Sequence, residues 1–129
     1  MPVSKTFEIY CAGHFITASE TLAVYNPYDG SRVATTCLAG DAELEEAVTA
    51  AANVAEELRK TPSFKRYDVL KQISEALLAQ KQQFANLITL ESGKPIRYAL
   101  GEVDRSIQTF VVAAEESRRL PKEYMSIDW

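Results

Sequence analysis

The hydrophobic pattern of this chain changes at Gly40, and this change constrains the fold more than any other feature. Before Gly40, apolar residues alternate with other residues in Phe7–Tyr10 and Thr21–Tyr25, as they do in half-buried strands. After Gly40, apolar residues recur every three or four positions, which is the period of an amphipathic helix. The pattern predicts a small β-ribbon over residues 1–40, followed by three amphipathic helices over residues 41–120.

The predicted ribbon depends on turns that the sequence supplies. The strongest is Asn26–Gly30, where Pro27 fixes its own φ angle and Gly30 tolerates the positive φ of a tight hairpin. The return strand is expected at Arg32–Leu38. Gly13 divides the earlier strand-like run into short pieces. A ribbon of this size is marginal alone, so we expect it to pack on another element.

The first predicted helix begins after Gly40. Asp41 suits the N-cap position, and Glu43 lies in the first turn, where the helix dipole favours negative charge. One face of this helix is apolar and rich in alanine, so a neighbouring element can approach closely. That face comprises Leu44, Ala47, Val48, Ala51, Val54, Ala55 and Leu58.

Two further helices are separated by a glycine and a proline. Thr61 as N-cap, followed by proline, predicts a long helix over residues 63–92 with an apolar stripe. Gly93 ends that helix in a left-handed conformation, and Pro95 prevents its continuation. The stripe comprises Val69, Leu70, Ile73, Leu77, Phe84, Leu87 and Ile88.

The third helix is predicted from Pro95 to about Leu120. Its buried side consists of Val103, Ile107, Phe110, Val111 and Ala114. Gly101 inside this helix costs about 1 kcal/mol relative to alanine, which close backbone packing would explain. Residues 121–129 carry apolar side chains, including Trp129, with no partner segment after them. We interpret them as a connecting tail that is cut before its next element.

Composition excludes several classes of protein. The chain has 129 residues, of which 18 are acidic and 14 basic, and this net charge of −4 argues against a nucleic-acid partner. No apolar run approaches the roughly 20 residues that span a bilayer, and no secretory signal is present. The expectation is therefore a soluble cytoplasmic protein without a membrane or nucleic-acid partner.

Catalytic and metal-binding patterns are nearly absent. Cys11 and Cys37 are interpreted as reduced, half-buried strand residues, and His14 as an edge-strand or turn histidine without an acidic partner at a useful spacing. No metal-ligand spacing and no glycine-rich phosphate loop occurs. The adjacent glutamate pairs at 45–46, 56–57 and 115–116 are interpreted as solvated surface. Arg118 and Arg119 complement the dipole of the third helix, although arginine is also a good anion ligand.

Several motifs together resemble the aldehyde dehydrogenase superfamily. Residues 87–96 read LITLESGKPI, and they precede Gly101-Glu102-Val103 and a later Ala113–Glu116 stretch. Upstream, residues 26–30 look like the family's NPxxG turn, and Arg66 begins an R-x-x-x-L pattern. Each motif alone is weak, but their order and spacing are specific over residues 7–120. The resemblance implies an α/β aldehyde dehydrogenase-like fold, of which this chain is the amino-terminal fragment.

The resemblance also implies what each segment contributes. Residues 1–40 would belong to the subunit-contact region, 41–120 to the helices of the cofactor-binding domain, and 121–129 to a connecting tail. The family oxidises aldehydes to carboxylic acids, with hydride transfer to NAD or NADP through a thiohemiacetal on cysteine. The catalytic cysteine, the general-base glutamate and the nucleotide-binding strands lie beyond this stretch in the family. The chain alone is therefore expected to bind no cofactor and to be inactive.

By similarity, the third helix borders the substrate tunnel. Phe110 and Arg119 are the candidates for lining it, with Arg118 as the alternative, because an arginine near this helix end holds the anion in some relatives. The helices are expected to keep an uncovered apolar face, so self-association is expected too. A free-standing helical interaction module derived from this family is the second hypothesis, and an unrelated α+β protein is the third.

Overall fold

The structure is a computed structural model that describes residues 5–119 of the chain. Its strands lie before Gly40 and its helices after it, so the change of period was interpreted correctly. The predicted tail, 121–129, lies outside the described residues. In chain order the elements are β1 Lys5–Phe7, β2 Ile9–Cys11, β3 His14–Ile16, β4 Thr21–Tyr25, β5 Arg32–Cys37, α1 Asp41–Lys60, α2 Ser63–Ala79, α3 Lys81–Ser92 and α4 Ile96–Arg119.

The strands form two sheets rather than one ribbon. β4 and β5 pair antiparallel, as the predicted hairpin requires, but β1 adds to the other edge of β5 in parallel, giving the order β1-β5-β4. β2 and β3 form a separate antiparallel hairpin. The parallel pairing joins residues 5–7 to residues 34–36, and no local sequence signal announces such a distant contact. The expected Phe7–Tyr10 strand is therefore divided between the two sheets.

Both tight turns have the backbone that their residues favour. In the turn between β4 and β5, Gly30 has a φ of +70° and its N–H donates to the carbonyl of Asn26 at 2.8 Å. The Asp29 carboxylate accepts hydrogen bonds from the backbone and hydroxyl of Ser31. Ala12 and Gly13 both have positive φ between β2 and β3, as a two-residue type I′ hairpin requires.

Helix α1 begins one residue earlier than expected. Gly40, not Asp41, is the N-cap, and its N–H donates to the Glu43 carboxylate at 2.7 Å. Asp41 is the first helical residue, where it still complements the dipole. The predicted role of Glu43 in the first turn is thus fulfilled by a direct hydrogen bond to the cap.

The end of α1 is tied to the start of α2. Thr61 does not cap α2, because Pro62 occupies that position; instead the Thr61 hydroxyl donates to the carbonyl of Glu57. The Arg66 guanidinium donates to the carbonyls of Leu58 and Arg59, at 3.3 and 2.9 Å. A cation on the terminal carbonyls satisfies them and complements the helix dipole. Arg66 therefore fixes the elbow between these two helices.

The single long helix predicted over residues 63–92 is two helices. The chain leaves α2 at Gln80, whose φ of −109° and ψ of 16° lie outside the helical region. The N–H of Gln80 donates to Ala76, and its carbonyl accepts from Phe84, so one residue serves both helix ends. No glycine or proline marks this break, and the surrounding glutamines favour helix. The break between α2 and α3 could therefore not be predicted from the sequence. Residues 5–119 therefore contain four helices, not three.

The core lies where α2 and α3 pack against α4. Val103, Ile107 and Ala114 are buried, as predicted for the third helix, while Phe110 is half-buried and Val111 is 38% exposed. Gly101 is exposed, and a Cβ there would meet nothing within 4 Å, so close packing does not explain it. The core is built largely from small residues and aliphatic residues: Ala85, Ala99, Val103 and Ile107, with Leu77, Ile88 and Leu100 packed against them.

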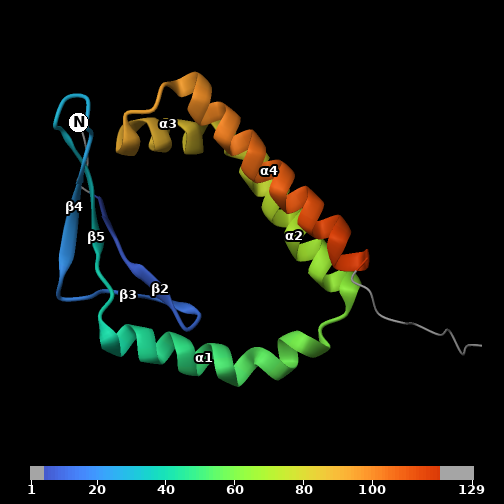
Figure 1. The fold of residues 1–129 in the computed structure, drawn as a ribbon. Coiled ribbons are helices and arrows are strands. Elements are labelled where there is room, and N and C mark those ends of the chain that lie inside the picture. Colours follow the sequence, from blue (N-terminus) through green and yellow to red (C-terminus); the bar gives the residue numbers. More distant parts are fainter. Residues whose placement is uncertain (1–4, 120–129) are drawn as a thin grey trace, which may run out of the picture.

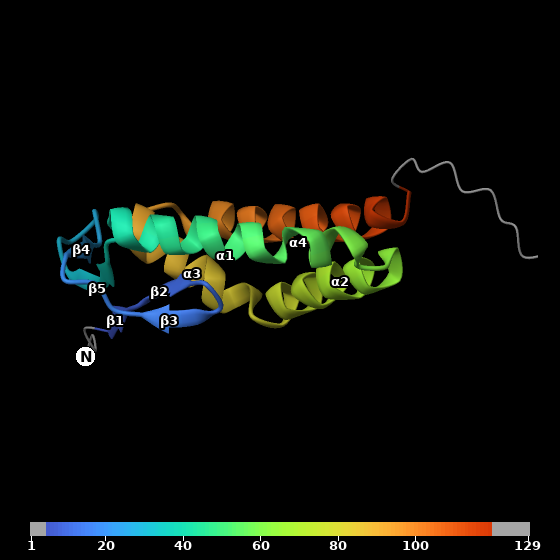
Figure 2. The same ribbon diagram turned by 90° about the horizontal axis from the view of Figure 1, so that it is seen from below.

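The elements follow one another around a ring. In Figure 1 the sheets form one side, α1 runs along the bottom, and the α2–α4 pair closes the opposite side with α3 at the top. Figure 2 shows the same arrangement from below, and Figure 1 shows that α4 is inclined to α1. No residue of α1 is buried. Its predicted apolar face is uncovered, with Leu44 59% and Leu58 63% exposed.

Candidate functional site

The cysteines and the histidine do not form a catalytic group. Cys11 and Cys37 are free and buried, on β2 and β5, so the expectation that they are half-buried strand residues was wrong about their exposure alone. Burial raises the pKa of the Cys11 thiol, and the charges of Glu46 and Glu43 raise it further. A raised pKa reduces the thiolate fraction, which is the nucleophilic form. Cys11 therefore has the environment of a structural thiol.

His14 has an acidic neighbour that the sequence did not reveal. Its Nε2 lies 3.8 Å from the Glu46 carboxylate of α1, and both side chains are about half exposed. The Cys11 thiol donates to the Glu43 carbonyl at 3.4 Å nearby. These contacts attach the β2–β3 hairpin to the first turns of α1. Across residues 5–119, no group of three or more His, Cys, Asp or Glu could hold a metal ion.

The junction between α3 and α4 brings several charged and polar side chains together. Gly93 ends α3 with a φ of +68°, as predicted, and a Cβ there would lie 3.0 Å from Pro27. The turn between β4 and β5 therefore packs directly against this junction. Lys94 follows, and its ammonium forms an ion pair with the carboxylate of Glu102, nearly two turns into α4.

An open pocket of about 650 Å³ lies at this junction. Glu102 accepts from Lys94 on Oε1, and the Arg105 guanidinium lies 3.5 Å from the same oxygen. The hydrogen bond from Lys94 lowers the pKa of Glu102, and the charges of Lys94 and Arg105 act in the same direction, against the effect of burial. The carboxyl is therefore ionised across the physiological range. The pocket is lined by Ser92, Lys94, Pro95, Tyr98, Gly101, Glu102 and Arg105.

A second pocket, of about 540 Å³, lies between the three-stranded sheet and α3. Its walls are mainly apolar, and Glu91 is the only charged residue among those that line it. It therefore offers surface for apolar contact rather than polar chemistry. Its lining residues are Phe7, Val24, Val33, Ala34, Thr36, Leu87, Leu90 and Glu91.

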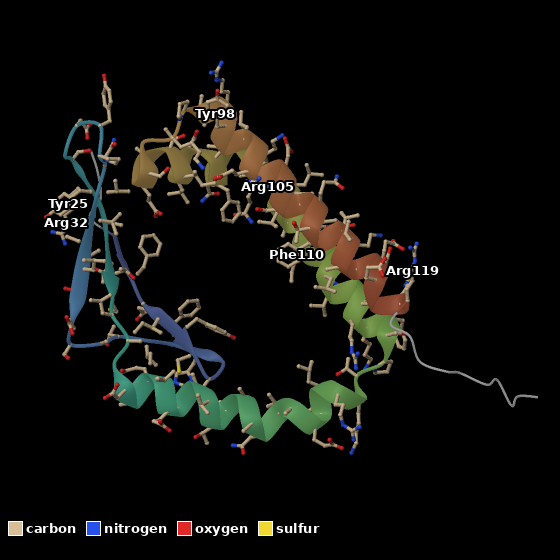
Figure 3. The ribbon with its side chains drawn as sticks, in the orientation of Figure 1. Tyr25, Arg32, Tyr98, Arg105, Phe110 and Arg119 are labelled. Atoms are coloured by element: carbon tan, nitrogen blue, oxygen red, sulfur yellow. The ribbon has the colours of Figure 1, made fainter. Side chains whose placement is uncertain are left out.

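The residues predicted for the substrate tunnel do not meet in one place. Phe110 and Arg119 are nine positions apart, which puts them on opposite faces of α4, roughly 13 Å apart along its axis (Figure 3). The Arg118 guanidinium stacks 3.4 Å from the ring centroid of Tyr67 on α2. Arg119 is 3.5 Å from Glu116 and largely exposed. Their role in a tunnel stays a prediction, although Arg118 already has a structural partner.

Arg105 is not among the site residues predicted from the sequence. It lies one turn after Glu102 and two turns after Tyr98, so all three share one face of α4. Figure 3 shows Tyr98, Arg105, Phe110 and Arg119 in order along this helix. The helical spacing of these three residues is visible in the sequence, but the family resemblance pointed to an arginine near the end of the helix and therefore to Arg118 and Arg119. Among the arginines of α4, Arg105 is the one that lines the junction pocket.

Comparison with known proteins gives a consistent result. The sequence model of the aldehyde dehydrogenase family matches residues 15–129. A 3-sulfolactaldehyde dehydrogenase of Priestia aryabhattai is 31% identical over 125 residues, covering 96% of this chain and 26% of that protein. A malonate-semialdehyde dehydrogenase of Bacillus pumilus is 37% identical over 107 residues, covering 81% of this chain and 22% of that protein.

The fold agrees with these relatives. The crystal structure of aldehyde dehydrogenase 21 from Physcomitrella patens, in complex with the reaction product succinate, superimposes with a TM-score of 0.90 and 33% identity. The match covers 98% of this chain and 26% of that one. The chain thus spans about a quarter of the length of the relatives it matches. The predicted fold class, an amino-terminal segment of such a fold, is confirmed.

Proposed function

The chain belongs to the aldehyde dehydrogenase family, and we propose that it forms the amino-terminal part of an NAD(P)-dependent enzyme that oxidises an aldehyde to a carboxylic acid. The observation that carries this proposal is the family match over residues 15–129, together with the fold shared with solved family members. The bound nicotinamide would accept the hydride. By the family resemblance, its binding residues would lie in the part of such an enzyme that follows this segment.

We further propose that this chain is inactive alone. In support, the buried Cys11 has the environment of a structural thiol with a raised pKa, and its Sγ donates to the Glu43 carbonyl. The test is a spectrophotometric assay of the purified chain with a panel of aldehydes and either NAD or NADP. We expect no reduction of the nicotinamide. Turnover that survives further purification would overturn this part of the proposal.

The proposed substrate class is an aldehyde with a negative charge at its far end. Two kinds of relative support it by their names, a 3-sulfolactaldehyde and a malonate-semialdehyde dehydrogenase, since a sulfonate and a carboxylate are both anions. Arginine is the side chain best suited to bind such groups. We propose Arg105 as the anion ligand because it lines a pocket. Arg119 and Arg118 remain the sequence-predicted alternatives for this role, and Phe110 remains a predicted tunnel-lining residue.

A chimera tests this assignment within an intact enzyme. Residues 15–119 would replace the matching segment of the Bacillus pumilus relative, and activity would be measured with malonate semialdehyde and with uncharged propanal. We expect Arg105→Ala to raise KM for malonate semialdehyde about tenfold or more, as loss of one charged hydrogen-bonding partner does, with propanal unchanged. Arg119→Ala and Arg118→Ala serve as matched variants. A selective effect of Arg119→Ala instead would transfer the role to the sequence-predicted residue.

Self-association is proposed for the isolated chain. Uncovered apolar patches of several hundred Å² rarely remain bare, and the face of α1 is such a patch, since Leu44, Val48, Val54 and Leu58 are each more than half exposed. No helix among the described residues is long and apolar enough to span a membrane. A free-standing interaction module is the alternative. A compact monomer in sedimentation velocity, without binding of a hydrophobic dye, would favour that alternative.

A further inference from the structure

The junction pocket contains two cations that share one oxygen of a single carboxylate. Lys94 Nζ and Arg105 Nη2 both contact Oε1 of Glu102, the first in a close ion pair and the second at 3.5 Å. The side chains of Lys94 and Glu102 are each 34% exposed, whereas that of Arg105 is 76% exposed. The Arg105 guanidinium is therefore the more accessible of the two cations, and the Glu102 carboxylate is in contact with it.

The other polar side chains of the pocket are neutral, and both already form hydrogen bonds with neighbouring residues. The Ser92 hydroxyl donates to the Ile88 carbonyl and accepts from the Lys94 N–H, and the Tyr98 hydroxyl accepts from Arg97. Two cations and one carboxylate leave the lining of this pocket with a single net positive charge. An anion that enters thus meets an attractive field of about one unit, with a fixed negative charge close by.

We propose that Glu102 is a specificity-determining residue, which lowers the preference of the junction pocket for doubly charged anions relative to singly charged ones. This inference rests on the proposed function, in which Arg105 holds the anionic end of the aldehyde. A carboxylate or sulfonate carries one negative charge, whereas a phosphate monoester carries nearly two at neutral pH. Glu102 would therefore weaken the binding of phosphorylated aldehydes more than that of short aldehydes with a carboxylate or a sulfonate.

The size of the effect follows from Coulomb's law. A unit charge about 6 Å from Glu102, in a surface environment close to that of water, is repelled by an amount that weakens binding about threefold. A doubly charged ligand in the same place is repelled twice as strongly in free energy. Because the factor in affinity depends exponentially on the free energy, doubling the free energy squares the factor, to about tenfold. The carboxylate thus changes the ratio of the two affinities, and not merely the overall binding.

The experiment titrates this chain with simple anions and follows the backbone amides by ¹⁵N NMR. The probes are methanesulfonate, with one charge, and methyl phosphate at pH 8, with nearly two, at constant ionic strength. Glu102→Gln removes the charge but keeps the shape, and Glu102→Asp keeps the charge. Glu75→Gln is the matched control, because Glu75 pairs with a lysine on α2 and its loss changes net charge equally.

We expect Glu102→Gln to tighten methyl phosphate binding about tenfold and methanesulfonate about threefold, with shifts centred on residues 92–105. Glu102→Asp should keep the wild-type ratio of affinities, and Glu75→Gln should change neither affinity. Equal gains for both anions would overturn the proposal, as would a Glu75→Gln effect of the same size or the absence of binding at these residues. A chimera indifferent to charged aldehydes would refute the proposed function alone, because this titration does not depend on catalysis.

Discussion

Replacing Ile107 with alanine tests whether the α2–α4 pair holds the helices together. Ile107 is 9% exposed and belongs to the core cluster, whereas Val112, on the same helix, is 57% exposed. Ile107→Ala removes three carbon groups, worth about 0.8 kcal/mol each on transfer from water, and adds a term for the cavity that remains. We expect it to lower the free energy of unfolding by about 3 kcal/mol.

Val112→Ala is the matched control. It removes two carbon groups from a side chain that is less than half buried, so a loss of about 0.7 kcal/mol is expected. Urea unfolding followed by circular dichroism at 222 nm measures both. With a slope of about 1.5 kcal/mol per molar urea, Ile107→Ala should lower the midpoint by about 2 M. Losses that differ by less than about 1 kcal/mol would refute the assignment of the core to this helix pair.

Three further predictions concern local features. Leu44→Gln with Val48→Gln on α1 should reduce dye binding and self-association in sedimentation velocity, while changing unfolding free energy by under about 0.5 kcal/mol per site, since both residues are exposed. Hydrogen bonds from the hydroxyl and backbone of Ser31 lower the pKa of Asp29. The ionised Asp29 therefore stabilises the fold above its unfolded pKa of about 3.9, and this stabilisation is lost as the pH falls through the lower folded pKa. Ser31→Ala should raise the pKa of Asp29 in an NMR titration. Cys11, whose pKa is raised, should react with iodoacetamide at pH 8 more slowly in the folded chain than in urea, and equal rates would contradict its burial.

Features encoded by neighbouring residues were predictable from the sequence. Gly30 and Gly93 adopt positive φ angles where the turn and the helix end required them, and the change of period at Gly40 separates strands from helices. The buried side of α4 followed from its spacing, with Val103 and Ile107 in the core. Each of these depends on backbone geometry or periodicity that a short stretch of sequence contains.

Features that depend on distant residues were not predictable. The parallel pairing of β1 with β5, the contact of His14 with Glu46, and the break at Gln80 have no local signal of glycine, proline or period. The candidate site shows the same limit. Arg105 was not predicted as a site residue because its role depends on a pocket that it forms together with Lys94, which lies in the turn before α4.

The least explained element is also the most informative. Helix α1 has 20 residues, near the length at which an isolated helix is marginal in water, and none of its residues is buried. It is held at its two ends, by the β2–β3 hairpin and by Arg66, rather than along its apolar face. Yet the open arrangement of sheets and helices recurs in a solved relative about four times longer, with a TM-score of 0.90. Local contacts at its ends therefore do not account for the position of α1 by themselves, whereas the recurrence in a relative shows that this arrangement belongs to the shared fold.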